Sequence, residues 1–316
     1  GVNPLSGHLH RRTKESIRRA AHMVAYVKKK GHSGAFWYIG NEEQHRYTGG
    51  IAGYAKVFKL HAQAMKKADP AIKIFWNANH VNAKMIETFL ENDGGTSDGL
   101  ETHGKWPYGG DPKGYKPGTF DQWLKEVPLR DRKNYNRAWR FAADTYRKAA
   151  ARKGREHYLI ADNEYGIGKA KNIQGFNRYG LGLLMTDMLQ EHFLGNWDMT
   201  CFWDTMRGDE NGLMSPRHRY RLNPFHLGMD LLADAQGGTM LDAATDNTFV
   251  YGFASGKAGR ILLYLINKTR EPQPLTVRLA GNPSVGRPGG RVMQDTSDHW
   301  GEVVDLPVQG TGPFKA

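Results

Sequence analysis

Two glutamates follow an asparagine at the end of an apolar stretch. Glu42 closes the stretch FWYIGNE, and Glu164 lies within LIADNEYG. Acidic side chains are rarely buried without a partner, so such a stretch either runs into solvent or delivers a carboxylate to a site. A pair of carboxylates can supply a proton donor together with a nucleophile or base, which is the chemistry that cleavage of a glycosidic bond requires.

The chain around these glutamates alternates between helical and extended patterns. Apolar residues recur at helical spacing over 13–30, 51–68, 82–90, 134–152, 176–190 and 224–234. Short apolar runs predict strands over 36–40, 72–76, 100–103, 157–161 and 199–203. Strands that alternate with helices are typical of right-handed crossover units, which build a parallel sheet covered by helices.

In parallel α/β sheets, functional side chains lie beyond the carboxyl ends of the strands. The five predicted strand ends carry Asn41 and Glu42, then Asn77, Asn79 and His80, then His103, Trp106 and Tyr108, then Glu164, and last Trp203 and Asp204. This set contains no glycine-rich phosphate loop and no metal triad, so we expect neither a cofactor nor a metal. Carboxylates, amides and aromatic rings together suit a sugar, whose hydroxyl groups need polar partners and whose ring faces stack on aromatic side chains.

Glu42 and Glu164 lie three predicted strands apart. In a closed barrel of eight strands, three steps bring two residues to nearly opposite rims, so their side chains can converge. Glu43 should point away from Glu42, and we expect it to be solvated or salt-bridged. Glu101 shares a strand face with His103, and two roles stay open for it: a third acid in the site, or a partner for a basic residue of the core.

The segments WYIGNE and LIADNEYG resemble the two catalytic segments of the clan A retaining glycoside hydrolases. In that clan the acid/base follows an asparagine at the end of barrel strand four, and the nucleophile ends strand seven. The segment DPAIKI after helix 51–68, His103, Trp203 and the C-terminal region are also similar to those of α-L-arabinofuranosidase-type and β-xylosidase-type members. The resemblance implies a (β/α)8 TIM-type barrel.

The resemblance also implies a role for each matching residue. Glu42 would be the general acid/base and Glu164 the nucleophile. The implied substrate-binding residues are Asn41 on the 2-hydroxyl, His103 beside the nucleophile or the sugar, Trp203 under the central subsite, Trp106 and Tyr108 in outer subsites, and Asn79 from its strand end.

The chain departs from that family in its number of strands. A complete barrel has eight strands, whereas the five predicted here match strands four to eight, and only twelve residues precede Thr13. We therefore expect a barrel domain over residues 1–236 that lacks its first three strands. The expected enzyme is a longer parent protein, secreted or periplasmic, and this chain alone is expected to be weakly active or inactive.

The pattern changes near Gly237. Short alternating segments separated by Gly, Pro and Asn predict strands over 248–253, 260–267, 275–279, 290–294 and 302–308. Antiparallel strands at this spacing predict a small β-sandwich over residues 237–316.

Composition excludes several classes of protein. No apolar run approaches the roughly 18–20 residues that cross a bilayer, so we expect no membrane partner. A single cysteine excludes a disulfide framework and a cysteine-based zinc site. The net charge of +12 is spread along the chain without a nucleic-acid motif, which argues against nucleic acid and leaves an anionic polysaccharide as one interpretation.

The expected function is a retaining glycoside hydrolase that cleaves a plant or algal polysaccharide or oligosaccharide by double displacement. Two alternatives stay open. One is an endo-acting hydrolase of an anionic or algal galactan, and the other is a non-catalytic carbohydrate-binding protein or inactive fragment. The sequence leaves the sugar, the linkage and the oligomeric state undetermined.

Overall fold

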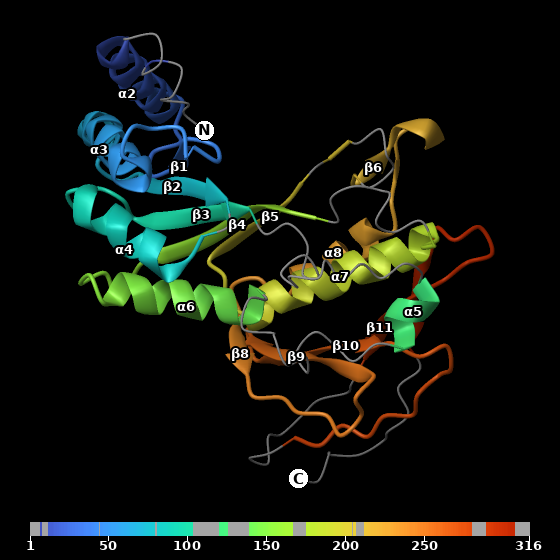
Figure 1. Ribbon diagram of the computed structural model, residues 1–316. Helices are drawn as coiled ribbons and strands as arrows, with labels where there is room; N and C mark the ends of the chain where they lie inside the picture. Colours follow the sequence, from blue (N-terminus) through green and yellow to red (C-terminus); the bar gives the residue numbers. More distant parts are fainter. Residues whose placement is uncertain are drawn as a thin grey trace. The chain divides into compact units, whose positions relative to one another are not determined.

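The computed structural model describes residues 7, 12–43, 45–79, 81–103, 120–125, 139–166, 175–203, 205–206, 212–279 and 289–306. The chain falls into two compact units (Figure 1). The first unit comprises 1–107, 136–166 and 195–203, and the second comprises 108–135, 167–194 and 204–316. The units thus group 167–194 with the C-terminal residues, and the predicted division into 1–236 and 237–316 stays a prediction.

The first unit is built on a parallel sheet of five strands. They are β1 (Phe36–Ile39), β2 (Lys73–Asn79), β3 (Gly99–His103), β4 (Leu159–Tyr165) and β5 (Met199–Phe202). Their order in the sheet is their order in the chain, and every neighbouring pair is parallel. The predicted parallel sheet is confirmed. Its five strands form an open sheet that corresponds to about half of a barrel.

Helices of the first unit follow one another along this sheet. They are α2 (Thr13–Lys29), α3 (Gly50–Ala68), α4 (Ala83–Asn92) and α6 (Trp139–Ala151). Figure 1 shows α3, α4 and α6 in the same order as the strands that they connect. The helix α4 begins where predicted, because the side chain of Asn82 accepts a hydrogen bond from the backbone N–H of Met85 at 3.0 Å.

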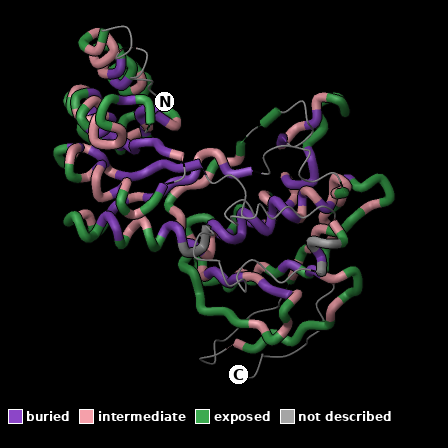
Figure 2. The backbone as a smooth tube through the Cα atoms, in the orientation of Figure 1, coloured by how far each residue is buried: buried purple, intermediate pink, exposed green. Residues whose placement is uncertain are grey.

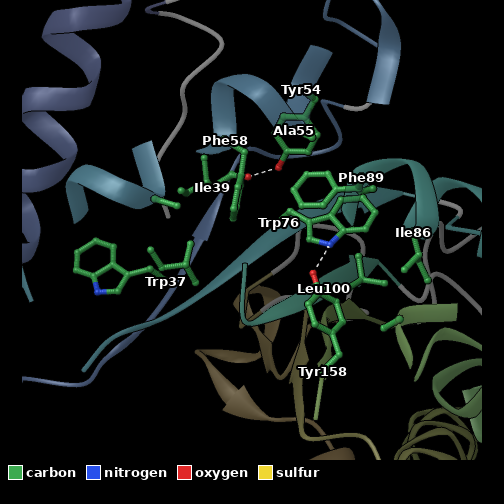
Figure 3. Close-up of a cluster of buried hydrophobic side chains, with 14 of the residues drawn as sticks. Trp37, Ile39, Tyr54, Ala55, Phe58, Trp76, Ile86, Phe89, Leu100 and Tyr158 are labelled. Carbon is green, nitrogen blue, oxygen red and sulfur yellow. Dashed lines mark hydrogen bonds between the residues drawn. The ribbon is translucent and has the colours of Figure 1, made fainter. Parts of the chain in front are cut away.

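The two faces of the sheet differ in chemistry, because successive side chains of a strand point to opposite faces. The helix-facing side is apolar and belongs to one buried cluster (Figure 3), which includes Trp37, Ile39, Ile74, Trp76, Leu100 and Ile160. The other face carries Asn77, Glu101 and His103, which are buried as well. Figure 2 shows the consequence, since the central strands are buried along their length while the helices alternate between buried and exposed residues.

A polar chain of contacts crosses the apolar cluster. The Trp76 ring stacks on Phe89 with centroids 4.1 Å apart, and its indole N–H donates to the Tyr158 hydroxyl at 2.8 Å (Figure 3). That hydroxyl lies 2.8 Å from Ser97 Oγ, which donates to the buried carboxylate of Asp93. The indole N–H of Trp76, the Tyr158 hydroxyl and Ser97 Oγ therefore all have partners, as burial requires.

The second unit contains the remaining described elements. Its helices are α5 (Phe120–Lys125), α7 (Arg178–Leu194), α8 (Phe225–Ala233) and the 3-10 turn η4 (Pro216–His218). Its strands are β6 (Met214–Ser215), β7 (Arg221–Leu222), β8 (Thr239–Leu241), β9 (Val250–Lys257), β10 (Arg260–Asn267), β11 (Gly290–Gln294) and β12 (Glu302–Leu306). The strands pair antiparallel as β10-β9-β8, β11-β12 and β6-β7. Phe193 of α7 stacks on Phe253 of β9 at 5.3 Å, which fixes this helix on that sheet.

One predicted strand of this unit is wrong. The segment 275–279 alternates apolar and polar residues, but it is not a strand, and Leu275 and Val277 are exposed. Alternation alone does not make a strand when neither face is packed and the backbone has no ladder partner. Packing of the antiparallel sheets into a sandwich stays a prediction. None of the described helices is both long and apolar enough to cross a membrane.

We predict that Tyr158→Phe destabilises the protein by about 1–3 kcal/mol, because it leaves the buried Trp76 N–H without an acceptor. Tyr26→Phe is the matched control, since Tyr26 is exposed. Chemical unfolding followed by circular dichroism measures both. Equal free energies of unfolding for the two variants would contradict the assigned role of the hydroxyl.

Candidate active site

The backbone after β1 turns sharply before Glu42. Gly40 and Glu42 have φ angles of 95° and 53°, in the left-handed region. The Tyr54 hydroxyl donates to the Ile39 carbonyl and accepts from the Asn77 backbone N–H, the latter at 3.0 Å. A Cβ at Gly40 would lie 2.7 Å from that hydroxyl, so only glycine passes it without a shift. Tyr54 therefore ends the β1 ladder and starts the turn that presents Glu42.

The side chain of Asn77 joins three site residues from a fully buried position. Its Oδ1 accepts from the Glu42 backbone N–H at 2.5 Å, and its Nδ2 donates to Glu101 Oε2. The same Nδ2 lies 2.9 Å from His103 Nε2. Because an N–H donor occupies the amide oxygen, the NH₂ group must face both Glu101 and His103. The Nε2 atom of His103 is then an acceptor, which assigns the imidazole proton to Nδ1.

His103 lies between the two carboxylates that the sequence singled out. Its Nδ1 is 2.7 Å from Glu42 Oε1 and 3.3 Å from Glu164 Oε2. The imidazole is fully buried, whereas the side chains of Glu42 and Glu164 are 28% and 18% exposed. The structure thus brings Glu42, His103 and Glu164 together, with the carboxylates accessible and the imidazole behind them.

The same three residues bear on the question of a metal. One donor atom from each of Glu42, His103 and Glu164 lies within 4.8 Å of the others, close enough to be considered for a cation. The contacts of the imidazole with both carboxylates already account for this closeness. We therefore assign no metal ligand here.

The orientation of Glu164 depends on an irregularity in β4. The register between β4 and β5 shifts between Asp162 and Tyr165. Within this bulge the Asp162 carboxylate accepts from the Glu164 backbone N–H at 3.2 Å, and the Trp203 N–H donates to the Tyr165 carbonyl at 2.9 Å. A bulge changes the direction of a side chain relative to a regular strand, which is how Glu164 reaches the site.

Glu101 is the buried acid of the site, with 1% of its surface exposed. Burial raises the pKa of Glu101 to about 9, despite the hydrogen bond from Asn77, and the charges of Asp162 and Glu164 raise it further. The carboxyl group therefore carries its proton at neutral pH. Of the two roles left open by the sequence, its place beside Asn77 and His103 favours a third acid in the site.

The other predicted site residues lie at the rim or outside the described part. Asn41 is exposed beside Glu42, and Trp203 follows β5 with 41% of its surface exposed. Asn79 is in register with His103 across β2 and β3. Trp106 and Tyr108 lie outside the described residues. The binding roles of all five stay predictions.

The expectation that Glu43 is solvated is wrong, whereas its alternative, a salt bridge, stays a prediction. Glu43 is buried and accepts a hydrogen bond from the Tyr47 hydroxyl at 2.6 Å. Burial, together with this hydrogen bond, raises the pKa of Tyr47. The expectation assumed a continuing strand, whereas the left-handed turn at Glu42 ends the alternation and lets Glu43 turn inward.

For two residues of the site the sequence left the role unassigned: Asn77 was only placed at a strand end, and Glu101 kept two open roles. A signal was present, because both are polar residues inside apolar strands. The register pairs Asn77 with Glu101 and Asn79 with His103. Polar residues at alternate positions of two neighbouring strands must share one face, and only a site or a satisfied polar network tolerates that.

Comparison with known proteins finds similarity in structure only. No family model matches the chain, and no curated protein sequence does. An α-L-arabinofuranosidase from Thermotoga maritima in complex with arabinose aligns at a TM-score of 0.59 and 16% identity, over 95% of this chain and 71% of the other. A GH51 arabinofuranosidase from Xanthomonas axonopodis pv. citri aligns at 0.56 and 17%, over 87% of this chain.

A third solved structure, of BuGH86 in complex with neoagarooctaose, aligns at a TM-score of 0.53 and 12% identity, over 86% of this chain. The chain spans 62% of the length of the Xanthomonas protein and 47% of that of BuGH86. At these identities the similarity shows the fold alone: the five-stranded parallel sheet and its helices resemble part of the α/β barrel of these arabinofuranosidases.

Proposed function

We propose that this protein is a retaining glycoside hydrolase in which Glu42 is the general acid/base and Glu164 is the nucleophile. The observation that carries the proposal is the approach of one oxygen from each carboxylate to within 4.8 Å, around His103. Retaining enzymes hold their carboxyl groups about 5–5.5 Å apart, and inverting enzymes about 6.5–9.5 Å apart to admit a water. The short separation supports direct attack by Glu164 on the anomeric carbon.

The reaction then proceeds in two steps. In the first, protonated Glu42 gives its proton to the glycosidic oxygen while the Glu164 carboxylate attacks the anomeric carbon. The bond to the leaving group breaks, and an ester forms between the sugar and Glu164. In the second, the Glu42 carboxylate takes a proton from water, which attacks the anomeric carbon and releases Glu164.

His103 supports both steps through its Nδ1–H. A neutral imidazole that donates a hydrogen bond toward both carboxylates orients them without fixing a positive charge beside Glu42. A fixed positive charge would hold Glu42 ionised and remove the general acid. Asn41, Asn79 and Trp203 are proposed to contact the sugar, with the indole ring of Trp203 stacking under it.

The proposed substrate is a plant or algal polysaccharide or its oligosaccharides. Similarity in fold to arabinofuranosidases supports an arabinose-containing plant polymer as the first class to test. A second candidate is an algal galactan, supported by the net charge of +12 and by the similarity in fold to a protein crystallised with neoagarooctaose.

We predict that a 2-deoxy-2-fluoro glycoside with a good leaving group esterifies Glu164. With such a leaving group the first step needs the nucleophile and little help from the general acid. Peptide mass spectrometry locates the label, and Glu164→Gln should abolish both labelling and turnover. Glu271→Gln is the matched control, since Glu271 is an exposed glutamate of the second unit. Labelling of another carboxylate would overturn the assignment. Binding of polysaccharide without labelling or turnover would favour the carbohydrate-binding alternative.

We predict that Glu42→Ala lowers turnover of natural linkages by about 10²–10⁴-fold, the range for loss of a general acid. Azide should restore turnover of an aryl glycoside with a good leaving group, because this anion fits the space left by the carboxylate and needs no general base. Proton NMR of the glycosyl azide should show retained configuration at the anomeric carbon. An inverted azide would contradict double displacement, and so would an inverted sugar from the unsubstituted protein.

A further inference from the structure

Glu101 is buried among groups that disfavour a negative charge on its carboxyl group. The titratable groups that face it are Tyr38 of β1, Tyr54 of α3, His103 of β3, Asp162 and Glu164 of β4, and Cys201 of β5. Within the described part of the chain, no lysine or arginine pairs with it. A carboxylate in such a place would be buried and repelled by two neighbouring acids, which is costly unless the group is neutral.

We propose that Glu101 is a positioning residue, a neutral carboxyl group that holds the Asn77 amide and sets the tautomer of His103 so that Nδ1–H lies between Glu42 and Glu164. The proposal has two parts. The effect on the tautomer rests on the contacts that join Glu101, Asn77 and His103 and needs no assumption about the reaction. The effect on turnover rests also on the proposed function.

The contacts assign a different task to each oxygen of Glu101. Oε2 accepts from Asn77 Nδ2, which helps to hold the amide with its oxygen toward the Glu42 N–H. Oε1 makes no hydrogen bond of ordinary geometry and lies 3.5 Å from His103 Nε2, while the backbone N–H of Asn163 also approaches the carboxyl group. A proton on Oε1 would point toward the lone pair of that nitrogen. His103 Nε2 then faces two donors, Asn77 and Glu101, and its proton must lie on Nδ1.

Ionisation of Glu101 would reverse this arrangement. A carboxylate beside Nε2 is an acceptor, so it favours a proton on that nitrogen and a doubly protonated imidazole. The resulting positive charge would lie 2.7 Å from Glu42 and would hold that residue as a carboxylate, unable to donate a proton. The elevated pKa of Glu101, about 9, is consistent with a group that stays neutral through the working range of a general acid.

The tautomer is tested first, because its measurement needs no substrate. Nitrogen-15 NMR of labelled histidine distinguishes a protonated ring nitrogen from an unprotonated one. The chain has 13 histidines, so the signals of His103 are assigned by their loss in His103→Gln. We expect a protonated Nδ1 and an unprotonated Nε2 near pH 7, both in the unsubstituted protein and in Glu101→Gln. A protonated Nε2 in the unsubstituted protein would overturn the proposal even if the protein proves to be a glycosidase.

Two substitutions of Glu101 separate positioning from simple packing. Gln has the shape of the neutral acid, with an oxygen for Asn77 and an NH₂ group for Nε2, whereas Ala has neither. We expect Glu101→Ala to lower kcat by about 10–100-fold with little change in KM, and Glu101→Gln to recover most of that loss. Equal losses in both variants would contradict a neutral carboxyl and point to an ionised one. The other histidine signals report whether each variant is folded.

The pH dependence supplies a third readout. The folded-state pKa of Glu101, about 9, lies above its ordinary value of 4.5. The contribution of the neutral carboxyl to stability is therefore complete below pH 4.5 and is lost progressively as the pH rises toward 9. Relative to Glu101→Gln, the unsubstituted protein should lose melting temperature across that interval. A constant difference between the two would overturn the proposal, and failure of the hydrolase assays alone would leave this result and the tautomer intact.

Discussion

The amide of Asn77 is the contact on which the arrangement of the site depends. It is fully buried, and one short side chain fixes the backbone of Glu42, the carboxyl of Glu101 and the ring of His103. An amide has a defined donor end and a defined acceptor end, so its orientation sets the hydrogen-bonding role of each neighbour. The hydrogen bonding behind the two accessible carboxylates is thus set by a side chain that is fully buried.

This polar interior is possible because the opposite face of the sheet supplies the burial energy. Trp76 and Phe89 stack on the helix-facing side, next to Tyr54, whose hydroxyl reaches through to the other layer. Burial of apolar area contributes most of the stability of such a unit, whereas satisfied hydrogen bonds add little each and cost much when broken. The helix-facing side therefore stabilises the fold, and the inner face is free to specify one arrangement of polar groups.

The sequence predicts the large-scale pattern well and the local geometry poorly. Five parallel strands and the placement of Glu42 and Glu164 at strand ends follow from periodicity, because a buried strand has a strong apolar signal. The burial of Glu43 does not follow, since it depends on a left-handed residue that no local pattern marks. The exposed segment 275–279 shows the converse, because alternation without a packing partner gives no strand. The link between Asn77 and Glu101 needed the register of β2 against β3, which only the fold provides.

The hydroxyl of Tyr54 has a consequence for how motion in the helical layer reaches the site. It takes the place of a ladder partner for both the Ile39 carbonyl and the Asn77 N–H, at the point where β1 stops. The position of α3 and the end of the β1–β2 ladder are therefore coupled through this hydroxyl. A small displacement of this helix would break the hydrogen bonds of two backbone groups at once. The rate at which the Asn77 amide hydrogen exchanges with solvent would therefore report how often these bonds open.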